Sequence, residues 1–224
     1  MSPPLSPEEF EALKKYDTCT ISNAIETFNF RPRNAGFMRP EIKCVFPDLG
    51  VMLGYAVTGT IEAMRPAAQQ YSTHGWYDLI AQTPAPRVIV LKDLDDPPGV
   101  GSFWGEVNGN IHKALGCVGT VTNGGVRDLR EVYDLGFQFY SQHIDVSHAY
   151  IHMVESGKPV TIGGLQVKTG DLIQGDRHGV QIIPLEIARD IPKACEEVIA
   201  RERVIINYCQ SSDFTVEGLK QLRG

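Results

Sequence analysis

The sequence lacks any long apolar run: no stretch approaches the roughly 20 residues that a membrane-spanning helix needs. It also lacks an excess of basic residues, because 21 Lys and Arg stand against 27 Asp and Glu and give a net charge of -6. An acidic surface disfavours general nucleic-acid binding, which needs cations to displace phosphate counterions. The first ten residues show no basic-then-apolar signal peptide. We therefore expect a cytoplasmic protein with neither nucleic-acid nor membrane partners.

Cysteine is scarce and shows no pairing pattern. The five cysteines are an odd number, and no two of them have the C-x-x-C spacing. This excludes a disulfide framework and a zinc knuckle. Hydrophobic residues at 42% and charged residues at 21% are close to the averages of globular proteins. The 224 residues are therefore expected to fold around a proper hydrophobic core in a reducing compartment.

The residue patterns predict a single mixed α/β domain over residues 1–224. A helix over 6–16 is expected because Ser6 and Glu9 form a capping box around Pro7. Short β-branched segments separated by glycine turns between 159 and 184 indicate a β-rich second half, and a long helix is expected over about 185–209. In the first half, the predicted strands are 52–62, 87–91, 117–122 and 137–141, and the predicted helices are 103–115 and 126–135.

Two predicted helix starts, at Gly105 and at Gly124-Gly125, carry residues with clear chemistry. The free N–H groups of a helix start carry partial positive charge and suit a carboxylate or a phosphate. If both helices follow strands of one sheet, both starts lie at the same sheet edge. Arg127 could then bind a carboxylate with two guanidinium nitrogens, and Asp128 could hold a hard divalent cation against the same ligand. The alternative is that Asp128 only complements the helix dipole and Arg127 forms a surface ion pair.

Four groups of residues together resemble the RraA-like family. They are Trp104-Gly105-Glu106, Ala114-x-Gly116-x-x-Gly119, the Gly-Gly-x-Arg-Asp stretch at 124–128, and Gly170-Asp171…Asp176…Gly179-Val180…Pro184. The resemblance covers about residues 18–200. This family includes 4-hydroxy-4-methyl-2-oxoglutarate aldolases that also decarboxylate oxaloacetate. It implies a β/β/α sandwich of the swivelling phosphohistidine-domain type, and self-association to a homotrimer or a dimer of trimers with sites between subunits.

The resemblance also implies roles for individual residues. Asp128 would be the protein ligand to Mg²⁺ or Mn²⁺, with waters and substrate in the remaining coordination positions. Arg127 would bind the carboxylate and keto oxygen of a small oxo-acid substrate. Glu106 would complete the catalytic set with Arg127 and Asp128 and would orient a metal-bound water. The backbone N–H contacts to the substrate carboxylate would come from the segment Gly105, Glu106, Val107 and Asn108.

These features predict a metal-dependent lyase that breaks a carbon–carbon bond beside a pyruvyl group. Either retro-aldol cleavage or β-decarboxylation leaves an enolate, whose charge a divalent cation stabilises. Retro-aldol cleavage also needs a base for the C4 hydroxyl, and a metal-bound water or a carboxylate of another subunit would serve. Two alternatives stay open: a non-catalytic protein-binding regulator, since the family's namesake inhibits an RNA-degrading enzyme, and a metal enzyme acting on a different organic acid.

Two features depart from the family pattern. The chain has Ser22-Asn23-Ala24 where the family often has an aspartate before the alanine, and residues 142–148 are rich in histidine. In that segment His143 and Asp145 alternate on one face of a predicted strand, with His148 beyond them. They could reach the site as an acid–base pair. The simpler interpretation, which we prefer on sequence grounds, is a hydrogen-bonded rim or a subunit contact.

Overall fold

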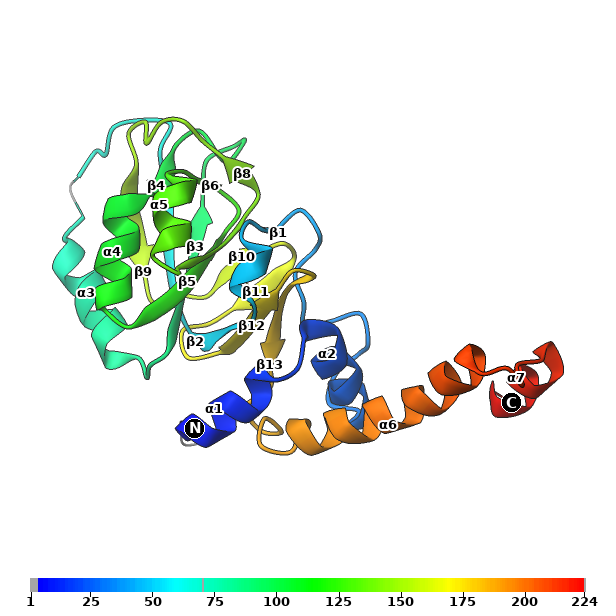
Figure 1. Ribbon diagram of the computed structural model, residues 1–224. Coiled ribbons are helices and arrows are strands. Elements are labelled where there is room, and N and C mark those ends of the chain that lie inside the picture. The colour runs from blue at the N-terminus through cyan, green and yellow to red at the C-terminus, as the bar shows by residue number, and fades with distance from the viewer. Residues whose placement is uncertain (1–3, 70, 224) are drawn as a thin grey trace.

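A large mixed sheet runs through the centre of the molecule (Figure 1). The computed structural model describes residues 4–69 and 71–223; residues 1–3, 70 and 224 of the predicted domain lie outside the described residues. The strand order is β1-β7-β5-β3-β2-β12-β13, and β9 pairs with β2. The strands of this sheet are β1 (Lys43–Cys44), β2 (Met52–Glu62), β3 (Arg87–Asp93), β5 (Cys117–Thr122), β7 (Gln138–Ser141), β9 (His152–Ser156), β12 (Leu172–Asp176) and β13 (Gly179–Ile183).

A small second sheet continues the parallel part of the large one. Strands β2, β3, β5 and β7 pair in parallel, and β3, β5 and β7 each break and then resume as a short strand. The resumed strands pair in parallel in the order β4-β6-β8, which repeats the order β3-β5-β7. They are β4 (Ser102–Trp104), β6 (Gly125–Val126) and β8 (His143–Ile144). The carboxyl edge of the parallel strands is thereby extended outward, and this edge carries the candidate site.

The helices that follow the small sheet begin later than predicted. Helix α4 (Glu106–Ala114) starts three residues after the predicted boundary, and α5 (Leu129–Asp134) also starts three residues late. The reason is that Trp104 and Val126 lie in strands β4 and β6, where both side chains are fully buried in an apolar cluster. Burial of these side chains against the sheet outweighs their weak preference for a helix.

The β-rich second half agrees with the prediction. Strands β10 (Val160–Ile162) and β11 (Leu165–Val167) form an antiparallel hairpin, and β12 and β13 form another that adds to β2. The N-terminal helix α1 (Pro7–Lys14) has the predicted capping box, although it ends before residue 16. The remaining elements of the first ninety residues are α2 (Thr18–Thr27), the 3₁₀ helix η1 (Pro47–Leu49) and α3 (Thr73–Gln82).

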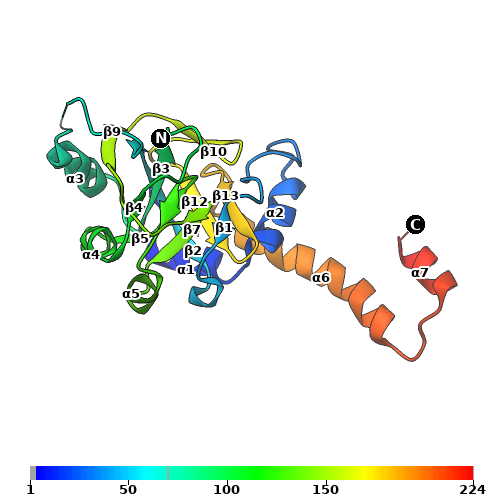
Figure 2. The same ribbon diagram turned by 90° about the horizontal axis from the view of Figure 1, so that it is seen from above.

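The C-terminal helices extend away from the body of the molecule (Figures 1 and 2). Residues 185–190 form turns, so α6 (Ile191–Gln210) begins later than the predicted residue 185. Pro192 lies in the first turn of α6, where its missing N–H removes no helical hydrogen bond. Only the first half of α6 contributes buried residues, and α7 (Val216–Arg223) contributes none. Across residues 4–69 and 71–223, no helix is both long enough and apolar enough to cross a membrane.

Candidate active site

The carboxyl ends of β4 and β6 bring the predicted residues together. Helix α4 begins directly after β4, and Arg127 and Asp128 directly follow β6. Because β4 and β6 are parallel neighbours, these two segments lie side by side at one sheet edge. The backbone N–H of Arg127 donates to the carbonyl of Trp104 at 3.1 Å, which fastens one segment to the other.

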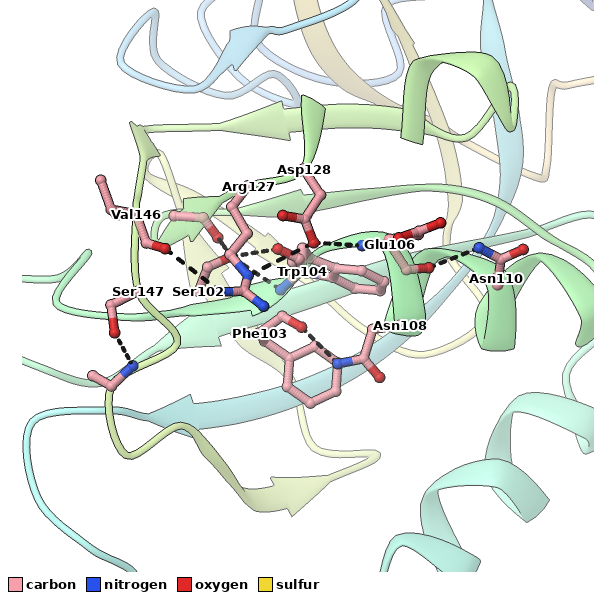
Figure 3. Close-up of polar contacts among 12 residues, drawn as sticks. Ser102, Phe103, Trp104, Glu106, Asn108, Asn110, Arg127, Asp128, Val146 and Ser147 are labelled. Atoms are coloured by element: carbon pink, nitrogen blue, oxygen red, sulfur yellow. Dashed lines mark hydrogen bonds and ion pairs between the residues drawn. The ribbon is translucent and has the colours of Figure 1, made fainter. Parts of the chain in front are cut away.

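The carboxylate of Asp128 lies against the first turn of α4 (Figure 3). Its Oδ2 atom accepts a hydrogen bond of 2.9 Å from the backbone N–H of Glu106 and lies 3.8 Å from Nε of Arg127. A Cβ atom at Gly105 would come within 2.5 Å of the same oxygen, so only glycine leaves room for this carboxylate. The side chains of Arg127 and Asp128 are 34% and 35% exposed, and a ligand can therefore reach both.

The second predicted helix start, at Gly124-Gly125, is wrong, so no helix N-terminus offers an anion site there. Val126 is in a strand, and the short helix α5 starts at Leu129, with Asp128 as its N-cap residue at a left-handed φ of 52°. Aspartate tolerates this conformation better than most residues do, and it turns the chain sharply out of β6. The guanidinium of Arg127 and the carboxylate of Asp128 therefore lie at the start of the neighbouring helix α4 and not at the start of their own helix α5.

The first turn of α4 offers backbone donors at its exposed end. Glu106 and Val107 are exposed, Val107 by 73%. The N–H groups at a helix start have no intrahelical partner, so those of Val107 and Asn108 stay available for a ligand next to Asp128. The side chain of Asn108 is used differently: its Nδ2 donates to the carbonyl of Phe103 at 2.6 Å and ties the turn to β4.

A buried aromatic cluster supports this turn from behind. His112 lies one turn further along α4 and is fully buried. Its Nδ1 is 2.7 Å from the carbonyl of Asn108, and its Nε2 accepts a hydrogen bond of 3.0 Å from the indole of Trp76. With Nε2 as the acceptor, Nδ1 carries the proton and donates. Burial lowers the pKa of His112 to about 4, so the ring is neutral and serves to fix the position of the turn.

Arg127 is also held from the side of β8. Its Nη1 donates to the carbonyl of Val146 at 3.5 Å, and Figure 3 shows the guanidinium beside the segment of Val146 and Ser147. The guanidinium thus stands between the Asp128 carboxylate and the loop that follows β8. Part of its donor fork remains for an incoming carboxylate, which is the group that guanidinium binds best.

The residues present fit a hard divalent cation that keeps most of its water. Among the described residues, no three His, Cys, Asp or Glu side chains are grouped to enclose a metal ion. Within the same residues, the second oxygen of Asp128, Oδ1, accepts no protein hydrogen bond and remains free as a ligand. Mg²⁺ is commonly held by one or two carboxylates, with water and substrate oxygens completing the octahedron. One free carboxylate oxygen beside an anion-binding turn matches that habit.

The histidine-rich segment lies beside the site and is hydrogen-bonded to it through its backbone, as the rim interpretation expects, while the subunit contact stays a prediction. In the register of β6 and β8, Gly125 is opposite His143 and Val126 is opposite Ile144. Atoms Nε2 of His143 and Oδ2 of Asp145 are buried and have no hydrogen-bond partner in residues 4–69 and 71–223. His148 is exposed, and its Nδ1 lies 2.8 Å from the carbonyl of the next residue.

One residue close to this segment was not singled out from the sequence. Asp93, at the end of β3, is 2% exposed, and burial raises its pKa. Its Oδ2 accepts the N–H of Gly99 at 2.8 Å. A carboxylate at the carboxyl end of a parallel strand is a usable sequence signal, but the predicted strand 87–91 stops two residues before Asp93.

The chain belongs to the RraA-like family. The family profile, described as Aldolase/RraA, matches residues 18–182. The family includes aldolases and decarboxylases as well as RraA regulators, and the predicted RraA-like α/β fold is confirmed by the solved structures that the chain resembles.

Among curated proteins, the chain is 31% identical over 98 residues to a Halalkalibacterium halodurans protein named "Putative 4-hydroxy-4-methyl-2-oxoglutarate aldolase", covering 42% of this chain and 47% of that protein. The chain thus spans about half the length of the curated relatives it matches. An uncharacterized protein from Pseudomonas syringae pv. tomato has a TM-score of 0.75 at 23% identity, covering 100% of this chain and 96% of that one. RraAS2 of Streptomyces coelicolor, described as an unusual member of the RNase ES inhibitor RraA family, has a TM-score of 0.67 at 20% identity, covering 90% and 98%. At these identities the two structures establish the fold alone.

Proposed function

We propose that the protein is a divalent-metal-dependent carbon–carbon lyase that acts on a pyruvyl-containing acid. The observation that carries the proposal is the arrangement around Oδ2 of Asp128 at one exposed turn. The backbone N–H of Glu106 lies 2.9 Å from this oxygen, and Nε of Arg127 lies 3.8 Å from it. Membership in a family that includes aldolases, and the name of the Halalkalibacterium halodurans relative, support the same class of reaction.

The chemistry follows from where negative charge develops. Cleaving the bond next to a pyruvyl group leaves its electron pair on an enolate oxygen, and fixed positive groups at that oxygen lower the barrier. Mg²⁺ or Mn²⁺ bound by Asp128 would supply Lewis-acid stabilisation there. Arg127 binds the substrate carboxylate and neutralises it, while the N–H groups of Val107 and Asn108 orient it at the start of α4. The side chain of Glu106 is exposed at this turn, and its carboxyl group would orient a water next to the substrate.

The test is release of pyruvate from oxaloacetate and from 4-hydroxy-4-methyl-2-oxoglutarate, with Mg²⁺ or Mn²⁺ and with EDTA. We expect turnover that EDTA abolishes and added metal restores. Asp128→Ala should lower kcat/KM by about 100-fold or more, the scale of losing a group that stabilises transition-state charge. Asp134→Ala is the matched control, because Asp134 is an exposed aspartate of α5 that pairs with Arg130 and should leave the rate unchanged.

Arg127 offers a second, independent variant. Arg127→Lys keeps the charge but loses the two-pronged geometry, so it should raise KM for both substrates and recover only part of the rate lost in Arg127→Ala. Absence of turnover of both substrates by folded wild-type protein with metal present would refute the proposed lyase activity. Metal titration would then decide whether the site serves another acid, or whether a binding role is the better account.

We further propose that the protein self-associates, as a homotrimer or a dimer of trimers. The support is an apolar surface around the site: Val107 is 73% exposed, Ile144 is 65% exposed and Val146 is 96% exposed. Exposed apolar side chains grouped next to a functional edge are typical of an interface. Light scattering during size-exclusion chromatography measures the mass directly, and a monomer of 24.7 kDa would contradict this proposal.

A further inference from the structure

Three ionisable side chains next to the candidate site each lie over a glycine. A Cβ at Gly124 would lie 2.9 Å from Oδ2 of Asp93, and a Cβ at Gly99 would lie 2.6 Å from the ring of His143. A Cβ at Gly125 would overlap the carboxylate of Asp145 outright. The backbone is therefore shaped to admit these three side chains, which we call the Asp93–His143–Asp145 cluster.

The cluster is buried in part and incompletely paired. Oδ2 of Asp145 and Nε2 of His143 have no hydrogen-bond partner among the described residues, although both atoms are buried. Leaving a buried polar atom unpaired destabilises the folded state, so two such atoms in one place are unusual in a part that serves only stability. The three groups also act on one another electrostatically. Burial raises the pKa of both carboxyl groups, His143 acts in the opposite direction on each of them, and Asp93 adds to the rise at Asp145.

Asp145 connects this buried cluster to the candidate site. Its backbone N–H donates to the carbonyl of Val126 at 3.0 Å, and the register of β6 and β8 places it next to Arg127. The carbonyl of the following residue, Val146, accepts from Nη1 of Arg127. The carboxylate of Asp145 lies over Gly125, two residues before Arg127. Its Oδ2 is buried and unpaired, while Oδ1 has no bond within the described chain and is not among the buried unpaired atoms. Asp145 therefore has one buried oxygen and one accessible oxygen close to the site.

We propose that Asp145 accepts the hydroxyl proton of the substrate in retro-aldol cleavage at the Arg127–Asp128 site, and that His143 and Asp93 position it. This inference rests on the proposed function and identifies the base within the same chain. The carboxylate of Asp145 takes the proton of the C4 hydroxyl, the C3–C4 bond breaks, and its electron pair passes to the enolate of pyruvate. Water then protonates C3, and the proton on Asp145 neutralises the hydroxide formed, so that atoms and charge balance.

The discriminating experiment compares two substrates in one variant. Decarboxylation of oxaloacetate involves no hydroxyl proton, whereas cleavage of 4-hydroxy-4-methyl-2-oxoglutarate does. In Asp145→Asn we expect aldol cleavage to fall by about 100-fold or more, as for a lost general base, and oxaloacetate decarboxylation to change by less than about 3-fold. The retained decarboxylation also proves that the variant is folded. Asp134→Asn, on the exposed face of α5, is the matched control that should change neither rate.

The neighbours of Asp145 provide a readout that a structural role would not move. Because His143 lowers the pKa of Asp145, His143→Gln should move the acid limb of the aldol pH profile to higher pH. Because Asp93 raises that pKa, Asp93→Asn should move the limb to lower pH. Carbon NMR of the Asp145 carboxyl group should show the same two directions without any substrate.

The outcomes separate this inference from the proposed function. Wild-type decarboxylation without any aldol cleavage would overturn the role of Asp145 and leave the lyase proposal standing. Equal loss of both reactions in Asp145→Asn, or an unchanged aldol rate, would also overturn it. If the wild type turns over neither substrate, both proposals fail together.

Discussion

The molecule contains two aspartate–histidine pairs with the same spacing on a strand end, and their surroundings differ sharply. Asp176, at the end of β12, is 5% exposed and fully bonded. It accepts hydrogen bonds from the N–H and the hydroxyl of Thr18 at 2.7 and 2.8 Å, and from the N–H of His178 at 2.8 Å. Asp145, two residues after His143, keeps one oxygen buried with no hydrogen-bond partner in the part of the chain that the structure describes.

The difference is visible in the direction of each pKa. Burial alone would raise the pKa of Asp176, but the hydrogen bonds from Thr18 and His178 outweigh it and hold the pKa below the ordinary value. Burial raises the pKa of Asp145, and no hydrogen bond offsets it. The carboxylate of Asp176 has a structural role, because its hydrogen bonds to Thr18 fix the start of α2 to the sheet. A buried carboxylate without donors is poised to take a proton.

The largest effect that this comparison predicts is on stability at Asp176. Asp176→Ala removes the acceptor of three hydrogen bonds and the partner of the His178 ring at 3.1 Å, and it leaves buried donors at Thr18 unpaired. We expect the free energy of unfolding to fall by about 3–5 kcal/mol, measured by urea denaturation. His178→Gln should cost far less, since the N–H of residue 178 still reaches Asp176. If Asp176→Ala lowered the free energy of unfolding by less than about 1 kcal/mol, the structural role assigned to Asp176, and with it the difference from Asp145, would be contradicted.

A slightly smaller effect is predicted for His112, which is as fully bonded as Asp176. Its pKa drops from about 6.5 to about 4 because burial disfavours the charged ring. The unfolded chain therefore binds a proton that the folded chain does not, and stability is lost as the pH falls from about 6.5 to about 4. This contribution amounts to about 3 kcal/mol. The measurement is the free energy of unfolding of the wild type and of His112→Gln at several pH values. The difference between the two proteins should shrink as the pH falls from about 6.5 to about 4. A difference that does not depend on pH would contradict the prediction.

The smallest effect has the opposite sign. Asp145→Ala removes the unpaired buried oxygen, so the free energy of unfolding at pH 7 should rise by on the order of 1 kcal/mol. Since the folded-state pKa of Asp145 is raised, the charged form is penalised above it, and the gain should vanish as the pH falls through that value and Asp145 becomes protonated in the wild type. Thermal unfolding at pH 7 and pH 4 checks both points. Asp134→Ala supplies the baseline of an exposed ion pair, a loss of about 0.3–0.5 kcal/mol.

Long strands were predictable because their signal is local. The predicted bounds of β2 and β5 agree with the structure, since continuous apolar and β-branched runs end at polar or glycine residues. Strands β4, β6 and β8 are two or three residues long and carry no periodicity, so the sequence pattern assigned parts of β4 and β6 to helices. Their existence depends on pairing between segments about twenty residues apart.

The candidate site, like the strands, was predictable only where the signal is local in the sequence. Arg127, Asp128 and the turn at Gly105 are recognisable from residue type and spacing, and the structure brings them together. His143 and Asp145 could be paired from their alternation in the sequence, but their meeting with Asp93 could not, because Asp93 comes from β3 and reaches them only through the sheet order. The unpaired atoms that distinguish Asp145 from Asp176 are likewise a property of packing, which no local pattern encodes.

The break between the large and the small sheet should let the small sheet unfold locally before the large one. At this break, side chains replace the strand ladder: the amide of Asn123 accepts the N–H of Asp93 and donates to its carbonyl, both at 2.9 Å, and the hydroxyl of Ser141 donates to the carbonyl of His143. Such substitutes release at lower free energy than a continuous ladder, so amide exchange should be faster in β4, β6 and β8 than in β3, β5 and β7. We therefore expect the edge that carries Arg127 and Asp128 to open as a local unit and to adjust to a ligand while the main sheet stays folded.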